Sequence, residues 1–246
     1  MSSSHPSVGS TVHRPYLHPY LAMGATVAAA GAILGAVLAS PAADGWRLLH
    51  WLCKPLATVL IFALAWHARP VLSTRYRRRI LAGIACSLLG DVLLMLPQDL
   101  FVPGLVAFLC GHLCFIAAFL DDSRFGARPG WLLASLAYGA LNLYLLWDSI
   151  GAALRVPVIV YVVVLASMGG QALGRARPLA RHGSAHRAAV GALLFMLSDT
   201  LLAWNRFHAA LPLASLWVLS TYYLALWWIA RSVQRDDTVI EAGAVQ

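Results

Sequence analysis

The chain has 246 residues, of which 60% are hydrophobic and only 11% are charged. A soluble domain of this size could not bury so much apolar surface, so the composition excludes an ordinary soluble enzyme and indicates an integral membrane protein. The net charge of +8 does not indicate a nucleic-acid partner, because the arginines lie in short segments between apolar runs, as in membrane proteins.

Eight apolar runs follow a polar N-terminal segment, residues 1–20, that lacks the apolar core of a signal peptide and is expected to be a retained, disordered tail. Each run has about 17–20 residues, enough for a helix to cross roughly 30 Å of hydrocarbon. The runs are approximately 21–39, 48–67, 80–96, 103–120, 131–147, 156–173, 188–204 and 212–230. We therefore predict an all-α polytopic membrane protein, with eight transmembrane helices over residues 21–231 and a polar C-terminal tail over 232–246.

The arginines are divided unequally between the two sides that these helices define. Fourteen of the seventeen fall on the side of the N-terminus, the arginine-rich side, and only Arg47, Arg155 and Arg206 fall on the other. The positive-inside rule places the arginine-rich side, with both termini, in the cytoplasm. For a bacterial protein, the expected location is the inner (plasma) membrane.

Seven of the predicted helices carry a polar side chain at similar depth, roughly 7–15 Å below the arginine-poor side at about 1.5 Å per residue. These residues are Lys54, Asp91, His112, Asn142, Tyr161, Asp199 and Tyr222. Polar side chains at such depth usually face the interior of a helix bundle or a water-filled cavity. The pattern predicts a polar cavity in the half of the membrane that faces away from the cytoplasm.

Two aspartates of this layer occur in the same short sequence, Asp-x-Leu-Leu, at Asp91 and Asp199. Lys54 precedes the first by 37 residues, and Tyr161 precedes the second by 38. This spacing suggests two four-helix repeats in parallel orientation.

Paired carboxylates next to a cation can perform acid–base chemistry inside a membrane. If one of Asp91 and Asp199 keeps its proton and Lys54 balances the other, the set is neutral overall. It then holds a general acid beside a general base, which cleavage of an ether or acetal-like bond requires. Three alternatives are open: an ion pair that only fixes helix packing, a small proton-coupled transporter and a non-catalytic scaffold. Clustering toward one side favours a closed pocket over a transport path.

Other site types find little support in the sequence. No His-Glu-x-x-His or similar spacing is present, so we expect neither a metal nor a cofactor. The four cysteines lie inside apolar runs and are interpreted as small buried residues. The sequence lacks the Gly-x-Ser-x-Gly motif of serine hydrolases and a glycine-rich phosphate loop. His112 can be read as a proton shuttle or as a hydrogen-bonded core histidine.

Several segments together resemble the YhhN family of lysoplasmalogenases. They are Lys54-Pro55-Leu56, the run Ser87-Leu88-Leu89-Gly90-Asp91-Val92-Leu93-Leu94-Met95, Gly111-His112, the run from Leu197 to Phe207 with Ser198-Asp199-Thr200-Leu201-Leu202, and Thr221-Tyr222-Tyr223. The resemblance covers about residues 45–230. It implies an eight-helix enzyme that hydrolyses the alkenyl ether bond of a lysoplasmalogen to a fatty aldehyde and glycerophosphoethanolamine or glycerophosphocholine.

The resemblance also implies roles for the polar residues. Asp91 and Asp199 are expected to be catalytic, one as the acid and the other as the group that stabilises the cation and activates water, as in glycosidases. Lys54 is expected to hold the phosphate or tune the pair. The remaining expected contacts to the substrate, a lysophospholipid drawn from membrane lipid, are Ser87, His112, Asn142, Tyr161, Ser198, Asn205, Tyr222 and Tyr223. The sequence leaves the oligomeric state open.

Overall fold

The computed structural model describes residues 17–39, 44–176 and 183–235. These ranges form eight α-helices and one short 3₁₀ turn, Trp147–Ser149. The helices are α1 (Leu17–Leu38), α2 (Asp44–His67), α3 (Thr74–Met95), α4 (Phe101–Phe119), α5 (Pro129–Leu146), α6 (Ala152–Arg175), α7 (Ser184–Phe207) and α8 (Ala214–Arg231). Each predicted apolar run coincides with one helix, which confirms the all-α class. Most of the two predicted tails, 1–16 and 236–246, lies outside the described residues.

Several helices extend beyond their apolar runs. α3 begins at Thr74, six residues before the run, because the Ser73 hydroxyl caps it by accepting the Tyr76 N–H at 2.9 Å. α1 begins at Leu17, so residues 17–20 are helical although we expected a tail there. After α8, the backbone continues along residues 70–72, with a hydrogen bond of 2.9 Å from Leu72 N–H to the Val233 carbonyl.

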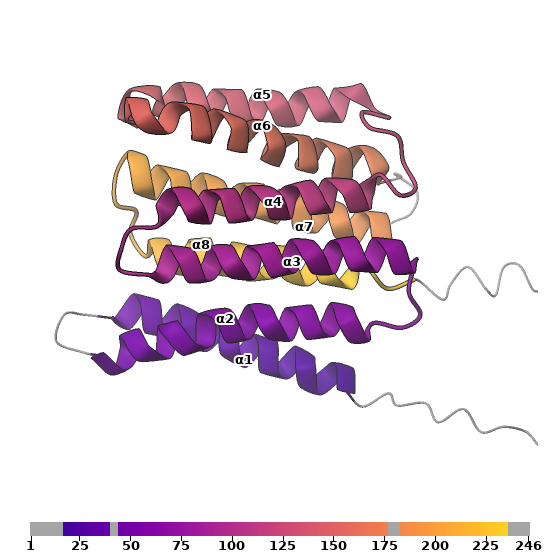
Figure 1. Ribbon diagram of the computed structural model, residues 1–246, viewed down its shortest axis with the longest axis horizontal. Helices are drawn as coiled ribbons and strands as arrows, with labels where there is room; N and C mark the ends of the chain where they lie inside the picture. The colour runs from indigo at the N-terminus through magenta and orange to yellow at the C-terminus, as the bar shows by residue number, and fades with distance from the viewer. Residues whose placement is uncertain (1–16, 40–43, 177–182, 236–246) are drawn as a thin grey trace, which may run out of the picture.

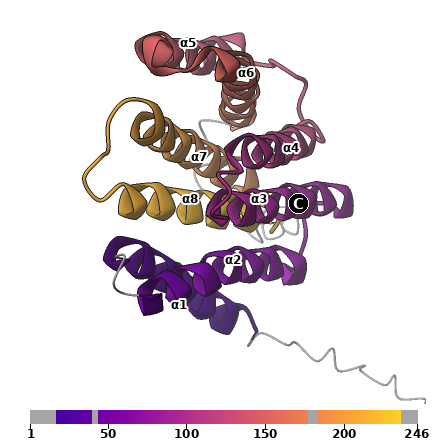
Figure 2. The ribbon, with the colours of Figure 1, turned by 60° about the vertical axis from the view of Figure 1, so that its left-hand side comes forward.

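The helices are stacked in four rows that the two views show consistently (Figure 1, Figure 2). The hairpin α1–α2 forms one outer row and the hairpin α5–α6 the other. Between them lie α3 with α8, and then α4 with α7. Consecutive helices run antiparallel, so all turns lie at one of two ends of the bundle (Figure 1).

Six helices are long and apolar enough to cross a membrane, namely α1, α2, α4, α5, α6 and α7. The protein is therefore an integral membrane protein. α3 and α8 do not meet that criterion, and they lie in the middle of the stack (Figure 2). A helix surrounded by other helices can carry an aspartate without exposing it to lipid. That α3 and α8 also span the membrane stays a prediction, as does the internal repeat.

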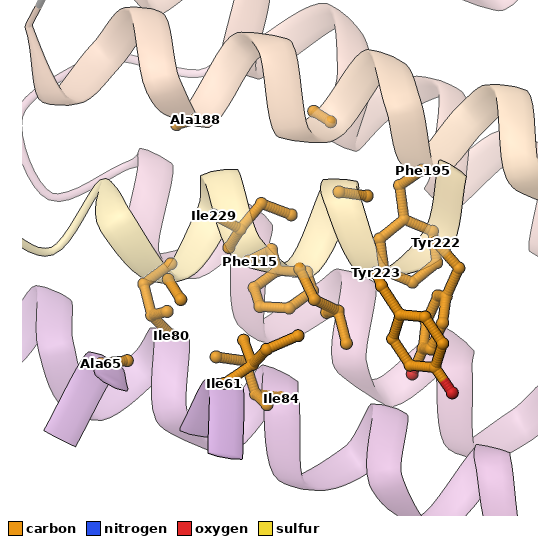
Figure 3. Packing of buried hydrophobic residues seen from close by; sticks show 14 of the residues in the cluster. Ile61, Ala65, Ile80, Ile84, Phe115, Ala188, Phe195, Tyr222, Tyr223 and Ile229 are labelled. Atoms are coloured by element: carbon orange, nitrogen blue, oxygen red, sulfur yellow. The ribbon is translucent and has the colours of Figure 1, made fainter. Parts of the chain in front are cut away.

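The core is built from large apolar side chains against small ones. Phe115 and Ile229 lie beside Ile61 and Ile84, whereas Phe195 lies next to Tyr222 (Figure 3), and all of these side chains are buried. The glycine at position 83 of α3 leaves room for the Phe115 ring, because a Cβ there would collide with it. The close approach of α3 to α4 brings Asp91 and His112 into the interior of the bundle.

Candidate active site

Asp91 lies at the centre of a closed cluster between α2, α3 and α8. Its Oδ2 accepts hydrogen bonds from Thr58 Oγ1 at 2.8 Å and from the Tyr222 hydroxyl at 2.7 Å. The Lys54 ammonium lies 3.7 Å from Oδ1 and donates to the Asp91 backbone carbonyl at 3.3 Å. The Tyr223 hydroxyl donates to the Lys54 carbonyl at 3.4 Å. The predicted association of Lys54 with an aspartate is thus an ion pair with several hydrogen bonds, as a buried pair requires.

Asp199 forms a second cluster with residues of α4 and α6. The Tyr161 hydroxyl donates to Asp199 Oδ2 at 2.6 Å. His112 Nε2 lies 3.0 Å from the Tyr161 oxygen and 3.5 Å from Asp199 Oδ2. Since the tyrosine proton points to Asp199, the histidine donates its Nε2 proton to the tyrosine oxygen. His112, Tyr161 and Asp199 therefore form a hydrogen-bonded chain along which a proton can move.

Aromatic rings lie between the two clusters. The centre of the Phe195 ring, on α7, lies 4.7 Å from the centre of the His112 ring and 5.5 Å from that of Tyr222. Both contacts are edge to face. Figure 3 shows Phe195 and Tyr222 next to each other. Among the described residues, no hydrogen bond or ion pair joins Asp91 to Asp199. That they act together on one bond stays a prediction.

A largely apolar pocket lies between α5, α6 and α7, with the start of α4 at one end. It has about 780 Å³ of empty space, counted together with its open side. Its walls include Asp199 and Tyr161, together with Asn142 on α5 and Leu165 and Met196 deeper in the bundle. The lining extends from the arginine-poor end toward the middle of the bundle, where an alkyl chain and one reactive polar group can meet.

The pocket distinguishes the two aspartates by access. The Asp199 side chain is 12% exposed and lines the pocket, whereas the Asp91 side chain is 3% exposed and does not. Asp199 Oδ1 makes no hydrogen bond to any residue in the described ranges. It is therefore the carboxylate oxygen whose hydrogen-bonding capacity is not used by these residues, while Tyr161 and His112 lie against Oδ2.

The other predicted contact residues fall into two groups. Asn142 lines the pocket and accepts a 3.0 Å hydrogen bond from the Trp204 indole. Asn205, Ser87 and Ser198 bond to backbone instead: Asn205 accepts the Leu211 N–H, Ser87 donates to the Gly83 carbonyl, and Ser198 donates to the Val218 carbonyl, each at 3.0 Å. None of these three lines the pocket, so their contact with a substrate stays a prediction.

Sequence reasoning missed two polar residues of the pocket wall, Tyr138 and Thr200. Their hydroxyls are hydrogen bonded to each other at 2.9 Å. Both had a signal, since Tyr138 lies one turn before Asn142 and Thr200 follows Asp199 directly. In the described ranges, no three His, Cys, Asp or Glu side chains are grouped so that they could hold a metal ion.

Comparison with known proteins identifies the family of the chain. The sequence profile described as the YhhN family matches residues 49–233, which include both aspartates, most of α2 and all of α3 to α8. The chain belongs to the YhhN family. The first helix, α1, lies outside the match, and the family region begins within α2.

Relatives of this YhhN protein include enzymes from mammals and bacteria. It is 37% identical to lysoplasmalogenase TMEM86B of Sus scrofa over 75% of this chain and 74% of the relative. It is 34% identical to lysoplasmalogenase TMEM86B of Homo sapiens, over 76% and 78% of the two chains. A lysoplasmalogenase of Mycobacterium tuberculosis is 34% identical over 81% of this chain and 71% of the relative. No solved structure matches the chain.

Proposed function

We propose that this YhhN protein is a lysoplasmalogenase, which hydrolyses the alkenyl ether bond of a lysophospholipid. The products are a fatty aldehyde and either glycerophosphoethanolamine or glycerophosphocholine. The observation that carries the proposal is the position of Asp199, an accessible carboxyl group on the wall of an apolar pocket. The relatives that are lysoplasmalogenases support the same reaction.

The chemistry begins with a proton transfer to carbon. An alkenyl ether reacts when an acid protonates its β-carbon, which turns the α-carbon and the ether oxygen into an oxocarbenium ion. Asp199 enters this step protonated on Oδ1, since an ionised carboxylate has no proton to give. The Tyr161 hydroxyl bonds the other oxygen, Oδ2, and so holds the acid in place against the pocket.

Water completes the reaction. It adds to the α-carbon and returns a proton to the Asp199 carboxylate, as in paired acid–base hydrolysis. The hemiacetal then breaks: its hydroxyl becomes the aldehyde, and the proton passes to the departing glycerol oxygen. One water is consumed, and the enzyme regains its starting form. The chain from Tyr161 to His112 can take up or supply a proton during these steps.

Asp91 is the second carboxylate of the proposal. Lys54 lies close enough to offset its charge, and Thr58 and Tyr222 donate hydrogen bonds to it, which compensates for the removal of the carboxylate from water. Its Tyr222 partner packs on Phe195, which in turn packs on His112. We assign Asp91 the role of the ionised partner that fixes these rings, with Asp199 as the acid that touches the substrate.

The proposal includes the place of the protein in the cell. With the arginine-rich end in the cytoplasm of a bacterium, both termini are cytoplasmic and all eight helices cross the inner membrane. The pocket then opens toward the opposite side. Labelling of single cysteines introduced at the two ends with a membrane-impermeant reagent tests this orientation in whole cells.

Aldehyde release tests the reaction. Purified protein in detergent is given lysoplasmenylethanolamine and, separately, the ester-linked lysolipid with the same tail. We expect aldehyde from the alkenyl lipid only, and a loss of about 10²–10⁴-fold in Asp199→Asn, the range for a general acid. Asp148→Asn, an exposed acid near the same end of the bundle, is the matched control and should keep full activity.

Two results would contradict the proposal. If folded wild-type protein releases no aldehyde, the chemistry is wrong, and proton-coupled transport becomes the function to measure in vesicles. If Asp199→Asn keeps full activity, the reaction takes place elsewhere in the molecule.

A further inference from the structure

Two arginines lie at the end of the pocket, on the side of the molecule that has few of them. Arg206 is in the last turn of α7, and Arg155 is in the first turn of α6. The only other arginine of that side is Arg47, on α2 in the opposite outer hairpin. Two of the three arginines on this side therefore belong to two of the helices that form the pocket wall.

Each of the two arginines touches a residue that lines the pocket. The Arg206 guanidinium lies 5.0 Å from the centre of the Phe101 ring, and Phe101 is part of the pocket wall. Arg155 Nε donates to the carbonyl of Ile150, another wall residue, at 3.3 Å. Arg155 also lies over the Trp147 ring at 4.6 Å. Ring and backbone contacts hold both guanidinium groups at the rim, which lowers the entropy lost when they bind a ligand.

Both guanidinium groups have nitrogens available for a ligand. Arg206 binds Asp99 through Nη2 alone, at 2.7 and 3.0 Å. Its Nη1 and Nε, like the two terminal nitrogens of Arg155, make no hydrogen bond to any residue that the structure describes. The Arg206 side chain is 42% exposed, so a ligand at the membrane surface can reach it. Pairs of N–H groups on a planar guanidinium match the oxygens of a phosphate.

We propose that Arg206 and Arg155 bind the phosphate of the substrate's headgroup while its tail lies in the pocket beside Asp199. This inference rests on the proposed function, because it assigns the headgroup end of the same pocket. Asp199 precedes Arg206 by seven residues on α7, which is about 10 Å of helix at about 1.5 Å per residue. A glycerol backbone and a flexible arginine side chain can bridge that separation. The protein is then specific for phosphate-bearing lysolipids over neutral alkenyl glycerols.

Binding of lipids that cannot react tests the phosphate contact. The full-length protein in detergent is titrated with a 1-O-alkyl lysophosphatidylethanolamine and with the 1-O-alkylglycerol of the same tail. In a variant with Arg155→Gln and Arg206→Gln, we expect the Kd of the phosphate lipid to rise tenfold or more and that of the alkylglycerol to change less than twofold. Arg47→Gln removes the same charge on the same side and should change neither Kd.

The outcomes separate this inference from the proposed function. An equal rise in both Kd values, or no change for the phosphate lipid, would overturn the arginine contact. The preference for the phosphate lipid can depend on the arginines while wild-type protein releases no aldehyde from the alkenyl lipid. In that case the phosphate site is supported and the proposed hydrolase activity is refuted. If the double variant does not fold, Arg206→Lys keeps a charge beside Asp99 but loses the forked donor. It should weaken the phosphate lipid several-fold and leave alkylglycerol binding unchanged, and an equal rise in the Kd of both lipids in this variant would refute the proposal.

Discussion

Asp91 lies on α3, the third of the first four helices, and Asp199 lies on α7, the third of the last four. The partners are Lys54 of α2 and Tyr222 of α8 for Asp91, and Tyr161 of α6 and His112 of α4 for Asp199. Each aspartate thus contacts the helix before it and one helix of the other half. The first cluster contains a charged pair and is closed, whereas the second contains tyrosine and histidine and opens to a pocket.

The outer hairpins explain the difference in access. In α1–α2, glycines allow close approach: a Cβ at Gly35 would lie 2.6 Å from the backbone nitrogen of His50. α1 also packs against α8, which seals the side of the Asp91 cluster. α5 meets α7 at few positions, and the space left between them is the pocket beside Asp199. One arrangement of helices therefore provides a stabilising ion pair on one side and an accessible acid on the other.

The largest difference between the two aspartate clusters is expected in the stability of their variants. Asp91→Asn leaves the buried Lys54 ammonium without its counter-ion, and loss of one partner of a buried pair costs about 3–5 kcal/mol. Asp199→Asn should change the free energy of unfolding by less than about 1 kcal/mol, because an amide oxygen can still accept the Tyr161 hydrogen bond. Denaturation of the purified variants in mixed detergent micelles measures both values. Equal losses would show that the two clusters do not differ as we describe.

A double variant, Lys54→Met with Asp91→Asn, removes both charges and should recover most of that stability. It also decides the role of Asp91. If the folded double variant is inactive, Asp91 takes part in the reaction as the second carboxylate. If it retains activity, the pair serves helix packing only, which was the alternative open from the sequence.

The two tyrosines provide a smaller contrast. Tyr161→Phe removes the hydroxyl that links Asp199 to His112, so we expect kcat to fall by roughly tenfold to a hundredfold, the lower part of the range for acid–base effects. Tyr222→Phe removes one of the hydrogen bonds to Asp91 and should cost about 1–3 kcal/mol of stability with little change in kcat. Aldehyde release and unfolding are measured on both variants. Similar kcat losses in the two would indicate that the Asp91 cluster acts on the substrate.

Much of this arrangement could be predicted from residue spacing. The eight helices follow from apolar runs of membrane length. Lys54 was expected to pair with one of the two aspartates because isolated charges are unstable at that depth; the structure identifies the partner as Asp91. The pocket could not be predicted, since an apolar residue such as Leu165 looks the same in sequence whether it faces lipid, a neighbour or a cavity. Ser87 and Ser198 were expected at the site for their chemistry, but a hydroxyl inside a helix can satisfy itself on a nearby carbonyl.

The smallest effect concerns the length of the lipid tail. Ala203 lines the pocket on α7, and Ala203→Leu would occupy space that we assign to the tail. Each methylene kept out of the pocket costs about 0.8 kcal/mol, so displacement of one or two should raise KM by about fourfold to fifteenfold for a long-chain alkenyl lipid. A lipid with a tail too short to reach Ala203 should be affected less. Leu197→Ala alters the same helix on its exposed face and should leave the dependence on tail length unchanged. If Ala203→Leu raises KM equally for short and long tails, the tail does not lie in this pocket, and the accessible face of Asp199 receives the substrate from another direction.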